Sequence, residues 1–526
     1  MQLGGLRADR RRSGARAVVT GGGDHWLLPD EPFESWAAYL AHHGSSAALD
    51  SRATSPATII EELERSGLRG RGGAGFPTGL KWRTIANHAC PVRYVVCNAA
   101  EGEPGTFKDR FLLRRNPYAC LEGIAIAARV VGAKKAFIGV KESFKPELER
   151  LRAAILEMVA AGVFEDIELE LVEGPGEYLF GEEKALLRFI EDGLPLPREA
   201  EAPPYELGLF GDQRSPNPAL VNNVETFAHV ASIVRAGGDS FRALGTHDTP
   251  GTVICTISGD VARPGVFEVE AGVPLSLLID EQAGGVRGAP VKAVLAGIST
   301  RPIPADKLHT PVDFGSLALI GSGLGSAGFI VLDESRSMPR VAQTIARFLY
   351  VESCNQCTAC KHGLGAASKA IDGMLAAGDR HPDDLERVVF GARSAPQGNR
   401  CYLPVQGSIL LPALLARFRS EFEPLLRAPA ADPERFPLPL LADFDEERRV
   451  FTYDDTTARK RPDWTYEPPL ELVPSIPHSE PEGSVGVRLD PDVASALRER
   501  GSATGRQLDA IANEILREHL SSGKGR

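Results

Sequence analysis

The chain has 526 residues, which is enough for several domains of about 100–200 residues each. Hydrophobic residues make up 43% of it and charged residues 25%, the balance of an ordinary globular protein. Its formal net charge of −11 argues against nucleic acid as the main partner, because phosphate binding needs a basic face, and no run of about 18 apolar residues predicts a transmembrane helix.

Residues 1–50 are predicted to be an N-terminal leader that is partly disordered. The opening stretch MQLGGLRADRRRSGAR is rich in arginine and has no apolar core, so it is not a secretory signal. A transit peptide is the alternative to a disordered leader.

Residues 51–245 are predicted to form an α/β domain. A helix over residues 54–66 starts at Ser55 and Pro56, which suit the N-cap and the first helical position. Apolar strands (YVVC, KAFIGV, IELELVEG) then alternate with helix-period segments around residues 117–131, 145–162, 182–192 and 223–236. This alternation is typical of an α/β sheet.

A glycine-rich stretch at residues 67–82, GLRGRGGAGFPTGLKW, is the first candidate ligand site. Its six glycines in thirteen positions let backbone N–H groups approach a phosphate or a flat ring without a Cβ in the way. Lys81 can neutralise a phosphate, and Phe76 offers an aromatic face for stacking. The stretch is neither a P-loop nor a clean dinucleotide fingerprint, and a flexible glycine loop is the alternative.

The strand RYVVCNAA runs into the acidic loop EGEPGTFKDR. A hydrophobic strand that ends in a polar loop is the usual ligand edge of an α/β sheet. Glu101 and Glu103 in this loop can accept hydrogen bonds from ribose or amide groups. A solvated loop is the alternative.

Two further patches fit the same site. The stretch GEYLFGEEKALL places Gly181, Glu182 and Glu183 at a helix start. The stretch ALVNNVETF offers amide and hydroxyl partners for a phosphate or a polyol chain, on Asn222, Asn223 and Thr226. Taken singly, each patch is more often a helix N-cap than a site.

Residues 246–335 change pattern to short strands, TVICTISGDV and GVFEVEAG, joined by glycine and proline turns. The later stretch LALIGSGLGSAGFIVLDE contains Gly321 and Gly323 between two apolar strands, with no helix directly after them. It is therefore not predicted to be a Rossmann dinucleotide site.

Residues 336–427 have a helical period and contain a cysteine triplet. In ESCNQCTACKHG, Cys354, Cys357 and Cys360 lie within seven positions. Zinc ligands usually come as two separated pairs, whereas a C-x2-C-x2-C run suits an iron–sulfur cubane whose fourth cysteine is distant. Cys401, in the loop GNRCYLP, is the best fourth ligand. His362 is the rival, and it would favour zinc.

The other four of the eight cysteines (Cys90, Cys97, Cys120 and Cys255) stand alone and are predicted to be small buried hydrophobes. A disulfide framework is not expected in a chain of this length without a secretion signal.

Residues 428–482 are predicted to be a proline-rich linker. Residues 483–526 then show an alternating VGVRL strand, a helix starting at Asp490 and Pro491, and a second amphipathic helix. Strand, helix and helix of this length resemble a ribbon–helix–helix module, which pairs through its strands. A pairing or docking role is favoured over DNA binding, and a helical tail packed on the main body is the alternative.

Together, the glycine loop, GEPGTFKD, GEE, NNVET and ESCxxCxxC with a distant cysteine resemble one family over about residues 55–425. It is the FMN- and NADH-binding flavoprotein subunit of respiratory complex I (NADH-quinone oxidoreductase), with relatives in NAD-linked hydrogenases and formate dehydrogenases. The resemblance implies a Rossmann-like FMN/NADH domain, a small ubiquitin-like β-grasp domain of the SLBB type over residues 246–335, and a helical domain carrying a [4Fe–4S] cluster.

The resemblance also implies roles for individual residues. The FMN contacts would be Gly70, Gly72, Lys81, Asn98, Glu101, Glu182, Asn222, Asn223 and Thr226. The NADH contacts would be Phe76, Glu103, Glu183 and Tyr205. The cluster ligands would be Cys354, Cys357, Cys360 and Cys401. No catalytic acid or base is required, because hydride transfer from NADH to the flavin belongs to the cofactors.

Three positions depart from the family pattern. Ala100 stands where the family usually has an aspartate that would bond the polyol chain of the flavin, Phe180 stands where it often has cysteine, and Ala202 replaces a lysine expected before Pro-Pro. Each lost polar contact weakens a ligand by about 1 kcal/mol.

Three hypotheses follow. The chain is an NADH-oxidising electron-input subunit, a diaphorase module of a soluble NAD-linked formate dehydrogenase, hydrogenase or aldehyde oxidoreductase, or a divergent non-catalytic paralogue with a dimerising or regulatory tail. The first two need iron–sulfur partners, of the kind that a thioredoxin-like [2Fe–2S] subunit and a larger iron–sulfur subunit would supply. The expected location is cytoplasmic, with any membrane association through those partners.

Overall fold

The computed structural model describes residues 26–199, 208–212, 215–376, 380–428, 436–463 and 466. The chain divides into two compact units, residues 1–466 and 467–526, and all the described residues belong to the first. The predicted ribbon–helix–helix tail over 483–526 lies outside the described residues, as do Tyr205 and Ala202.

The first sheet contains five strands in the order β3-β2-β1-β5-β4. Its strands are β1 (Tyr94–Ala99), β2 (Lys135–Lys141), β3 (Glu168–Gly174), β4 (Gly208–Asp212) and β5 (Ser215–Asn223). The first three and β5 run parallel, and β4 pairs antiparallel with β5 at the edge. From β1 the chain adds β2 and β3 on one side of the sheet, and it later adds β5 on the other side of β1. The strand order therefore reverses between β1 and β5. Open α/β sheets bind ligands at such a reversal, beyond the carboxyl ends of the strands.

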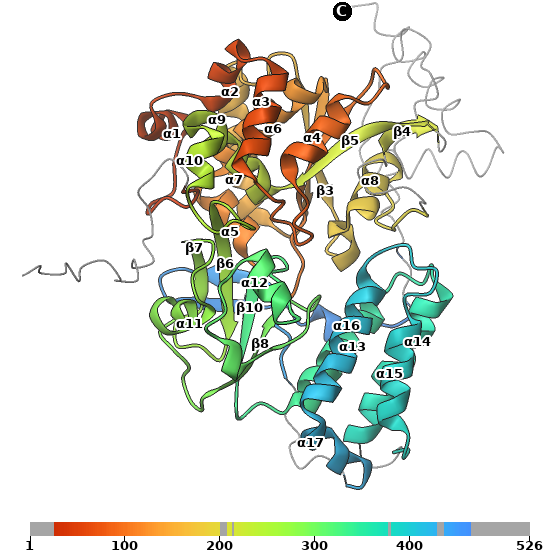
Figure 1. Cartoon of the computed structure of the whole chain (residues 1–526). Helices are drawn as coiled ribbons and strands as arrows, with labels where there is room; N and C mark the ends of the chain where they lie inside the picture. The colour runs from red at the N-terminus through yellow and green to blue at the C-terminus, as the bar shows by residue number, and fades with distance from the viewer. Residues whose placement is uncertain are drawn as a thin grey trace, which may run out of the picture. The chain divides into compact units, whose positions relative to one another are not determined.

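Helices from the N-terminal half pack around this sheet (Figure 1). They are α1 (Trp36–His43), α2 (Ala47–Asp50), α3 (Pro56–Ser66), α4 (Thr78–Ala86), α5 (Lys108–Arg115), α6 (Pro117–Val131), α7 (Lys145–Ala160), α8 (Glu183–Asp192), α9 (Val224–Ala236) and α10 (Gly238–Arg242). As expected, Ser55 caps α3, its hydroxyl accepting from the Thr58 N–H, and Gly67 ends the helix in a left-handed conformation.

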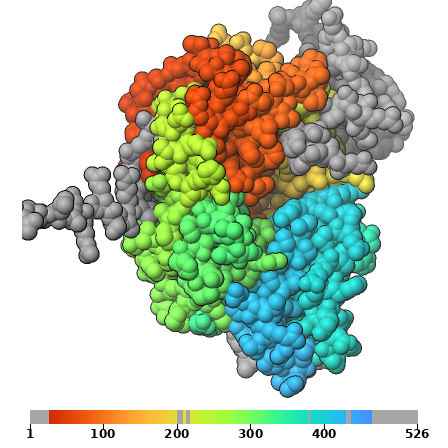
Figure 2. Space-filling model, in the orientation of Figure 1, coloured from red at the N-terminus to blue at the C-terminus, as the bar shows by residue number. Residues whose placement is uncertain are grey.

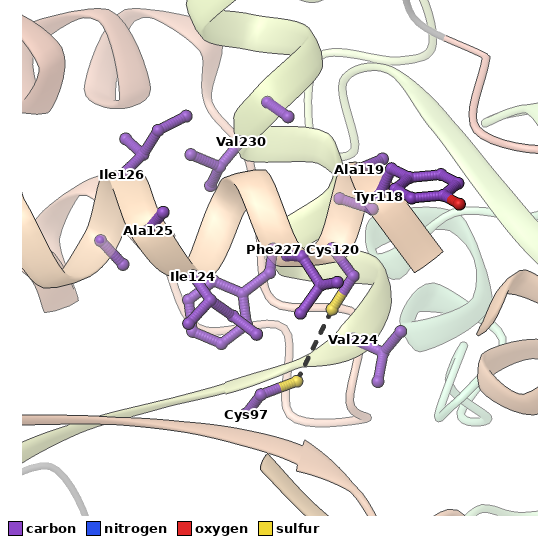
Figure 3. Close-up of a cluster of buried hydrophobic side chains, with 14 of the residues drawn as sticks. Cys97, Tyr118, Ala119, Cys120, Ile124, Ala125, Ile126, Val224, Phe227 and Val230 are labelled. Atoms are coloured by element: carbon purple, nitrogen blue, oxygen red, sulfur yellow. Dashed lines mark hydrogen bonds between the residues drawn. The ribbon is translucent and has the colours of Figure 1, made fainter. Parts of the chain in front are cut away.

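Helix α6 is buried almost throughout and forms the centre of the core. Figure 3 shows Cys120 and Ile124 of α6 beside Phe227 of α9 and facing Cys97 of β1. The two thiol sulfurs lie 3.8 Å apart, and both side chains are fully buried. Cys97, Cys120 and Cys255 are thus buried hydrophobes as predicted. Cys90 is not, since it is partly exposed in a loop with its sulfur 3.2 Å from Asn217 Oδ1.

The leader prediction is wrong for residues 26–50, which belong to the folded body. Trp36 stacks on Tyr39, and both rings contact Tyr118 of α6. The N–H groups of Leu27 and Leu28 donate to the buried carboxyl of Glu268 at 2.6 and 2.8 Å. The arginine-rich composition is confined to the residues before position 17, and the aromatic residues Trp36 and Tyr39 that follow are buried against α6.

The second sheet has the strand order β7-β6-β10-β8-β9. Its elements are β6 (Thr252–Gly259), β7 (Gly265–Glu270), α11 (Leu275–Leu277), β8 (Val291–Ala296), β9 (Ile303–Pro304), α12 (Phe314–Leu319) and β10 (Gly328–Asp333). Strands β6 and β10 are parallel, and the other pairs are antiparallel. It has a hydrophobic core of its own.

A helical bundle follows. Figure 1 shows α13, α14, α15 and α16 lying side by side. The helices are α13 (Met338–Glu352), α14 (Thr358–Leu375), α15 (Asp384–Ser394), α16 (Leu403–Arg417) and the short α17 (Arg419–Phe422). No helix among the described residues is long and apolar enough to cross a membrane.

The linker predicted over 428–482 is wrong for residues 436–463, which we call the C-terminal strap. The strap contains β11 (Leu441–Asp445), β12 (Val450–Tyr453) and α18 (Thr456–Arg459), and β11 and β12 pair as an antiparallel hairpin. Phe444 and Phe451 of the hairpin pack on Phe107, beside α5. Four buried apolar side chains, Phe436, Leu438, Phe444 and Phe451, hold the strap in place despite its acidic, proline-containing sequence.

Candidate active site

A cavity of about 940 Å³ lies at the carboxyl ends of β1 and β5. Its walls come from the glycine loop, the loop after β1, the segment before α8, the β5–α9 junction, the second sheet and the start of α16. In Figure 2 the orange N-terminal residues, the green second sheet and the cyan helices meet on one face. The cavity is therefore built from all three parts of the first unit.

The glycine loop is held in its shape by the buried side chain of Arg71. The Arg71 guanidinium donates to the carbonyl oxygens of Pro250 and Thr252 at 2.9 and 3.1 Å, and its backbone N–H donates to Thr226 Oγ1 at 2.9 Å. A Cβ added at Gly75, where φ is +63°, would lie 2.7 Å from the ring of Phe314. The loop thus requires glycine where it touches the second sheet.

Every FMN contact that the family resemblance implies lines this cavity, and so do three of the four NADH contacts. These are Gly70, Gly72, Lys81, Asn98, Glu101, Glu182, Asn222, Asn223 and Thr226, with Phe76, Glu103 and Glu183. The fourth NADH contact, Tyr205, is outside the described residues. Segments that are far apart in the sequence therefore share one cavity.

Several of these side chains already bond within the protein. Glu182 caps α8 by accepting from the N–H groups of Lys184 and Ala185, and burial raises its pKa to about 7. Asn223 caps α9 by accepting from the Glu225 N–H at 3.0 Å. Lys81 Nζ donates to the Val221 carbonyl at 2.7 Å and lies 3.3 Å from a carboxylate oxygen of Glu183. The polar groups are thus fixed in position before a ligand arrives.

Three buried polar atoms of the cavity wall have no hydrogen-bond partner among the described residues. They are Thr78 Oγ1, Asn222 Oδ1 and Ser326 Oγ. A buried polar atom without a partner costs free energy unless a ligand or water satisfies it. A flavin nucleotide, with its ring, polyol chain and phosphate, has the donors and acceptors and the approximate size that this cavity needs, so the residues fit the group.

A buried charge network lies beneath the loop after β1. Lys108 Nζ is 2.7 Å from Asp109 Oδ1 and 2.8 Å from Glu225 Oε2, and none of the three side chains is more than 6% exposed. Burial alone would raise the pKa of Glu225, but the charge of Lys108 and the hydrogen bond from His229 lower it to about 2. Burial and the Asp109 charge raise the pKa of Glu101 to about 7. Glu101 therefore takes up a proton at a higher pH than an ordinary glutamate does.

Tyr178 and Gln406 are functional candidates that sequence reasoning missed. The Tyr178 hydroxyl donates to Glu103 Oε2 at 2.6 Å and accepts from Gln406 Nε2 at 2.8 Å. Glu103 Oε1 accepts from the Ile298 N–H at 2.8 Å. Tyr178 lies in the GEYLFGEE stretch, whose glutamates were already candidate site residues, so the sequence could have indicated it. The residues around Gln406 do not indicate that it contacts Tyr178.

The second sheet also contributes residues that sequence reasoning left out. Ser299, Thr300, Phe314 and residues 323–326 line the cavity. The glycines after α12 lie between a helix and strand β10, so they do not form a Rossmann turn, as expected. Gly323 and Gly325 nevertheless line the large cavity. Of the departures from the family pattern, Ala100 lines the cavity and Phe180 is fully buried in the core beside Phe189.

The four predicted cysteine ligands surround a second, small cavity between α13, α14 and α16. Cys354 and Cys357 lie in the α13–α14 loop, Cys360 lies in the first turn of α14, and Cys401 closely precedes α16. His362, the rival ligand, is exposed. No group of three or more histidine, cysteine or acidic side chains in the described part of the chain is spaced to hold a single metal ion. The four thiols around one space fit a cubane, in which each thiolate binds a different iron.

Leu403 lines both cavities. The flavin-sized space and the cysteine cavity therefore share a wall residue, and Tyr402, the residue before it, also lines the larger cavity. The two cavities are therefore adjacent in the fold.

Comparison with known proteins agrees with this geometry. Residues 63–232 match the family described as "Nuo51 FMN-binding domain", and residues 340–425 match the "NADH-ubiquinone oxidoreductase-F iron-sulfur binding region". The chain is 37% identical over 377 residues to the second NADH-quinone oxidoreductase F protein of Rhizobium meliloti (strain 1021), covering 70% of this chain and 88% of the relative. It is 36% identical to the NADH-quinone oxidoreductase F protein of Rickettsia typhi (strain ATCC VR-144 / Wilmington), over 69% of this chain and 88% of the relative.

A solved structure of an NAD+-reducing [NiFe]-hydrogenase in the H2-reduced state is similar with a TM-score of 0.67 and 35% identity, over 78% of this chain and 67% of that chain. The chain belongs to the family of NADH-quinone oxidoreductase F proteins, whose members are NADH-oxidising flavoprotein subunits with FMN and an iron–sulfur cluster.

Proposed function

We propose that this chain is the electron-input subunit of a larger oxidoreductase, with NADH and FMN in the large cavity and a [4Fe–4S] cluster in the cysteine cavity. The observation that carries the proposal is Leu403, which lines both cavities. When bound, FMN supplies the conversion of a two-electron hydride from NADH into single electrons for the cluster.

The nine FMN contacts named above are proposed to act by position and charge. The glycine loop brings backbone N–H groups to the ligand, and Lys81 supplies a cation beside it. Asn222 Oδ1 and Thr78 Oγ1 supply the unpaired polar atoms. Glu101 and Glu182, both with a pKa raised to about 7, can be neutral next to an anionic ligand.

Phe76, Glu103 and Glu183 are the proposed NADH contacts, with Tyr205 as a fourth. Phe76 is 38% exposed and lies on the wall of the cavity, where an incoming nucleotide can stack on it. Glu103 is held from two sides, by Tyr178 and by the Ile298 N–H, so its carboxylate is fixed in place. The protein orients the reactants and excludes water, and the proposed reaction needs no side chain to act as acid or base.

The second candidate function is a diaphorase module in which electrons flow toward NAD+. The similarity to the NAD+-reducing [NiFe]-hydrogenase favours it, since the same fold there belongs to an enzyme that reduces NAD+. The third hypothesis, a non-catalytic paralogue, has Ala100 in its favour, because a carboxylate is missing from the cavity wall. The unpaired polar atoms of the cavity count against it.

Iron–sulfur subunits are the proposed partners, because electrons that reach the cluster must leave through another redox centre. Subunits of this kind would also account for any location at the cytoplasmic side of a membrane. The order and directions of β7-β6-β10-β8-β9 support a β-grasp domain of the SLBB type. Self-association through residues 483–526 stays a prediction from the sequence.

Iron and sulfide analysis of the purified full chain tests the cluster assignment. The wild-type chain and the control Cys90→Ala should both contain about four irons, because a cubane holds four and Cys90 lies in a loop away from the cysteine cavity. Cys401→Ala should lose most of the iron and the broad visible absorbance of the cluster. Equal iron content in Cys401→Ala and the control would refute the ligand set.

A further inference from the structure

Lys108, the first residue of α5, and Glu225, in the first turn of α9, form an ion pair that is closed off from solvent. Lys108 Nζ lies 2.8 Å from Glu225 Oε2, and the two side chains are 1% and 0% exposed. Burial raises the pKa of Glu225, but the charge of Lys108 lowers it to about 2. Burial lowers the pKa of Lys108, yet the charges of Asp109 and Glu225 raise it above its ordinary value. Both groups are therefore charged at neutral pH.

Stability alone does not account for an ion pair in this place. Taking two charges out of water costs about as much as their attraction returns, so apolar side chains of the same volume usually stabilise a core as well or better. Neither Lys108 nor Glu225 is among the described residues that line the large cavity, so a direct contact with a ligand does not account for the pair either. The explanation lies in the residues that the two side chains hold.

Lys108 holds the cavity wall on the side of α5. Its Nζ donates to Asp109 Oδ1 at 2.7 Å and to Asn223 Oδ1 at 3.3 Å. Asn223 Nδ2 in turn donates to Asp109 Oδ2 at 2.7 Å. Asp109 and Asn223 both line the cavity. A Cβ added at Gly72 would lie 3.2 Å from Asn223 Cβ, so the glycine loop also packs against these bonded residues.

Glu225 joins the glycine loop to the second sheet. Its Oε1 accepts from the Ile254 N–H of β6 at 2.9 Å and lies 3.9 Å from Arg71 Nε. The backbone N–H of Arg71 donates to Thr226 Oγ1 at 2.9 Å, and Thr226 lines the cavity. His229 Nε2, one turn further along α9, lies 3.7 Å from the same carboxylate oxygen. One carboxylate is therefore shared by α9, the glycine loop and β6.

Strand β6 also fixes the start of α5. The N–H of Phe107, the residue before Lys108, donates to Thr256 Oγ1 at 3.0 Å. Thr256 lies two positions after Ile254, so adjacent parts of one strand hold both members of the ion pair. The pair is thus the point at which the glycine loop, α5, α9 and β6 are bonded together.

We infer that the Lys108–Glu225 pair is a positioning device for the flavin. It acts from behind the cavity wall, by holding Asp109, Asn223 and Thr226 in the places from which they meet the ligand. The inference rests on the proposed function, because it takes FMN as the occupant of the large cavity. It goes further in assigning a role to two residues that do not contact the ligand.

Two variants separate this role from an effect on stability. Glu225→Gln keeps an acceptor for the Ile254 N–H but leaves Lys108 and Arg71 with one buried counter-charge fewer, so the flavin-free chain should melt at a lower temperature. Glu225→Gln/Lys108→Met restores the balance of buried charge, with Arg71 and Asp109 left, and should melt at a higher temperature than Glu225→Gln does.

Both variants should bind FMN about tenfold more weakly than wild type, or more weakly still, because several wall contacts are disturbed together. Net charge does not explain that loss. Glu225→Gln makes the site more positive, which would favour the anionic phosphate of FMN, and the double variant has the same charge as wild type. Quenching of flavin fluorescence measures the affinity, at a temperature at which each melting curve shows the chain folded.

A second readout is the KM for NADH of the FMN-saturated double variant. It should stay within about twofold of wild type, since the NADH contacts are held by other groups. Glu103 is held by Tyr178, and Glu183 lies 3.3 Å from Lys81 Nζ. A general loosening of the fold would instead weaken both ligands.

Glu122→Gln is the matched control. Glu122 is fully buried on α6 and pairs at 2.9 Å with Arg235, near the other end of α9. It is not among the described residues that line the large cavity. The control should lower the melting temperature as Glu225→Gln does and leave the affinity for FMN unchanged.

Wild-type affinity for FMN in Glu225→Gln/Lys108→Met would overturn the inference, and so would tighter binding by Glu225→Gln. An affinity that follows the melting temperature across all the variants, the control included, would assign the pair a structural role only. A double variant that melts no higher than Glu225→Gln would show that the two residues do not act as a pair. A wild-type chain that binds no FMN would overturn the proposed function, and the inference with it.

Discussion

The Tyr178 hydroxyl donates a 2.6 Å hydrogen bond to Glu103 and accepts one from Gln406 on α16. Three residues from the loop after β1, the segment before α8 and the cysteine-bearing bundle are thereby joined at the wall of the large cavity. Burial raises the pKa of Glu103, and the hydrogen bond from Tyr178 opposes that rise. The ionisation of Glu103 therefore depends on Tyr178.

Replacing Tyr178 by phenylalanine should weaken NADH binding. Glu103 loses the hydrogen bond that positions its carboxylate, so the KM for NADH should rise about fivefold. The acid limb of the kcat/KM profile should also move to higher pH, because Glu103 loses a partner that favours its charged form. Steady-state kinetics across the acid and neutral pH range measure both, with Tyr94→Phe as the control. An unchanged KM and an unmoved acid limb would show that Tyr178 has only a packing role.

Replacing Thr78 by valine should lower the affinity for FMN without lowering the stability of the flavin-free protein. Thr78 is buried and its hydroxyl has no partner among the described residues, so the flavin-free protein should melt at the same temperature or slightly higher. FMN affinity, measured by quenching of flavin fluorescence, should fall about fivefold, the effect of one lost hydrogen bond. Thr84→Val is the matched control, since the Thr84 hydroxyl bonds the Leu80 carbonyl on the exposed side of α4. If Thr78→Val binds FMN as tightly as the control does, the hydroxyl does not face the flavin.

Restoring a carboxylate at Ala100 should tighten FMN binding. Ala100 is 2% exposed and lines the cavity. An aspartate there can accept from the polyol chain of the flavin, which corresponds to about 1 kcal/mol or roughly fivefold in affinity. Ala100→Asn has nearly the same shape without the charge and is the comparison. Weaker binding by Ala100→Asp than by wild type would mean that the cavity has adapted to alanine.

The buried carboxyl of Glu268 should make stability fall as the pH rises. Burial raises its pKa to about 8, although the hydrogen bonds from Thr252, Leu28 and Leu27 oppose the shift. Between the unfolded pKa near 4.5 and about 8, the folded chain holds a proton that the unfolded chain has lost. The free energy of unfolding should therefore decline by about 1.4 kcal/mol per pH unit across that window from this group.

Glu268→Gln keeps an acceptor for Leu27 and Leu28 but cannot ionise. Urea unfolding at several pH values inside that window should show a shallower decline in this variant than in wild type. Parallel pH curves for the two proteins would contradict the proton assignment. Glu270→Gln, at the partly exposed end of the same strand, is the control.

The sequence identified the site where local composition is unusual. Six glycines in a short loop and three cysteines in seven positions have few structural uses, so Gly72 or Cys357 could be found without the fold. Tyr178 and Gln406 could not, because they are 228 positions apart and each is ordinary in its own segment. Their contact exists only because α16 meets the segment before α8 in the folded chain.

The C-terminal strap was misread for a different reason. Prolines and acidic residues in 428–482 are typical of linkers, and two isolated phenylalanines among charged residues gave no periodic signal. Phe444 and Phe451 lie on opposite strands of a hairpin, and their ring centroids are 4.4 Å apart. Tertiary packing on Phe107 decides the structure there.

Anaerobic titration of the full, FMN-loaded chain with NADH is the decisive test of the electron-input role. Flavin absorbance and the EPR signal of the cluster are followed together. We predict that the flavin bleaches at low NADH and that the signal of a reduced cluster follows. A chain that holds its cluster but whose flavin neither binds nor bleaches would contradict the assignment of an electron-input subunit.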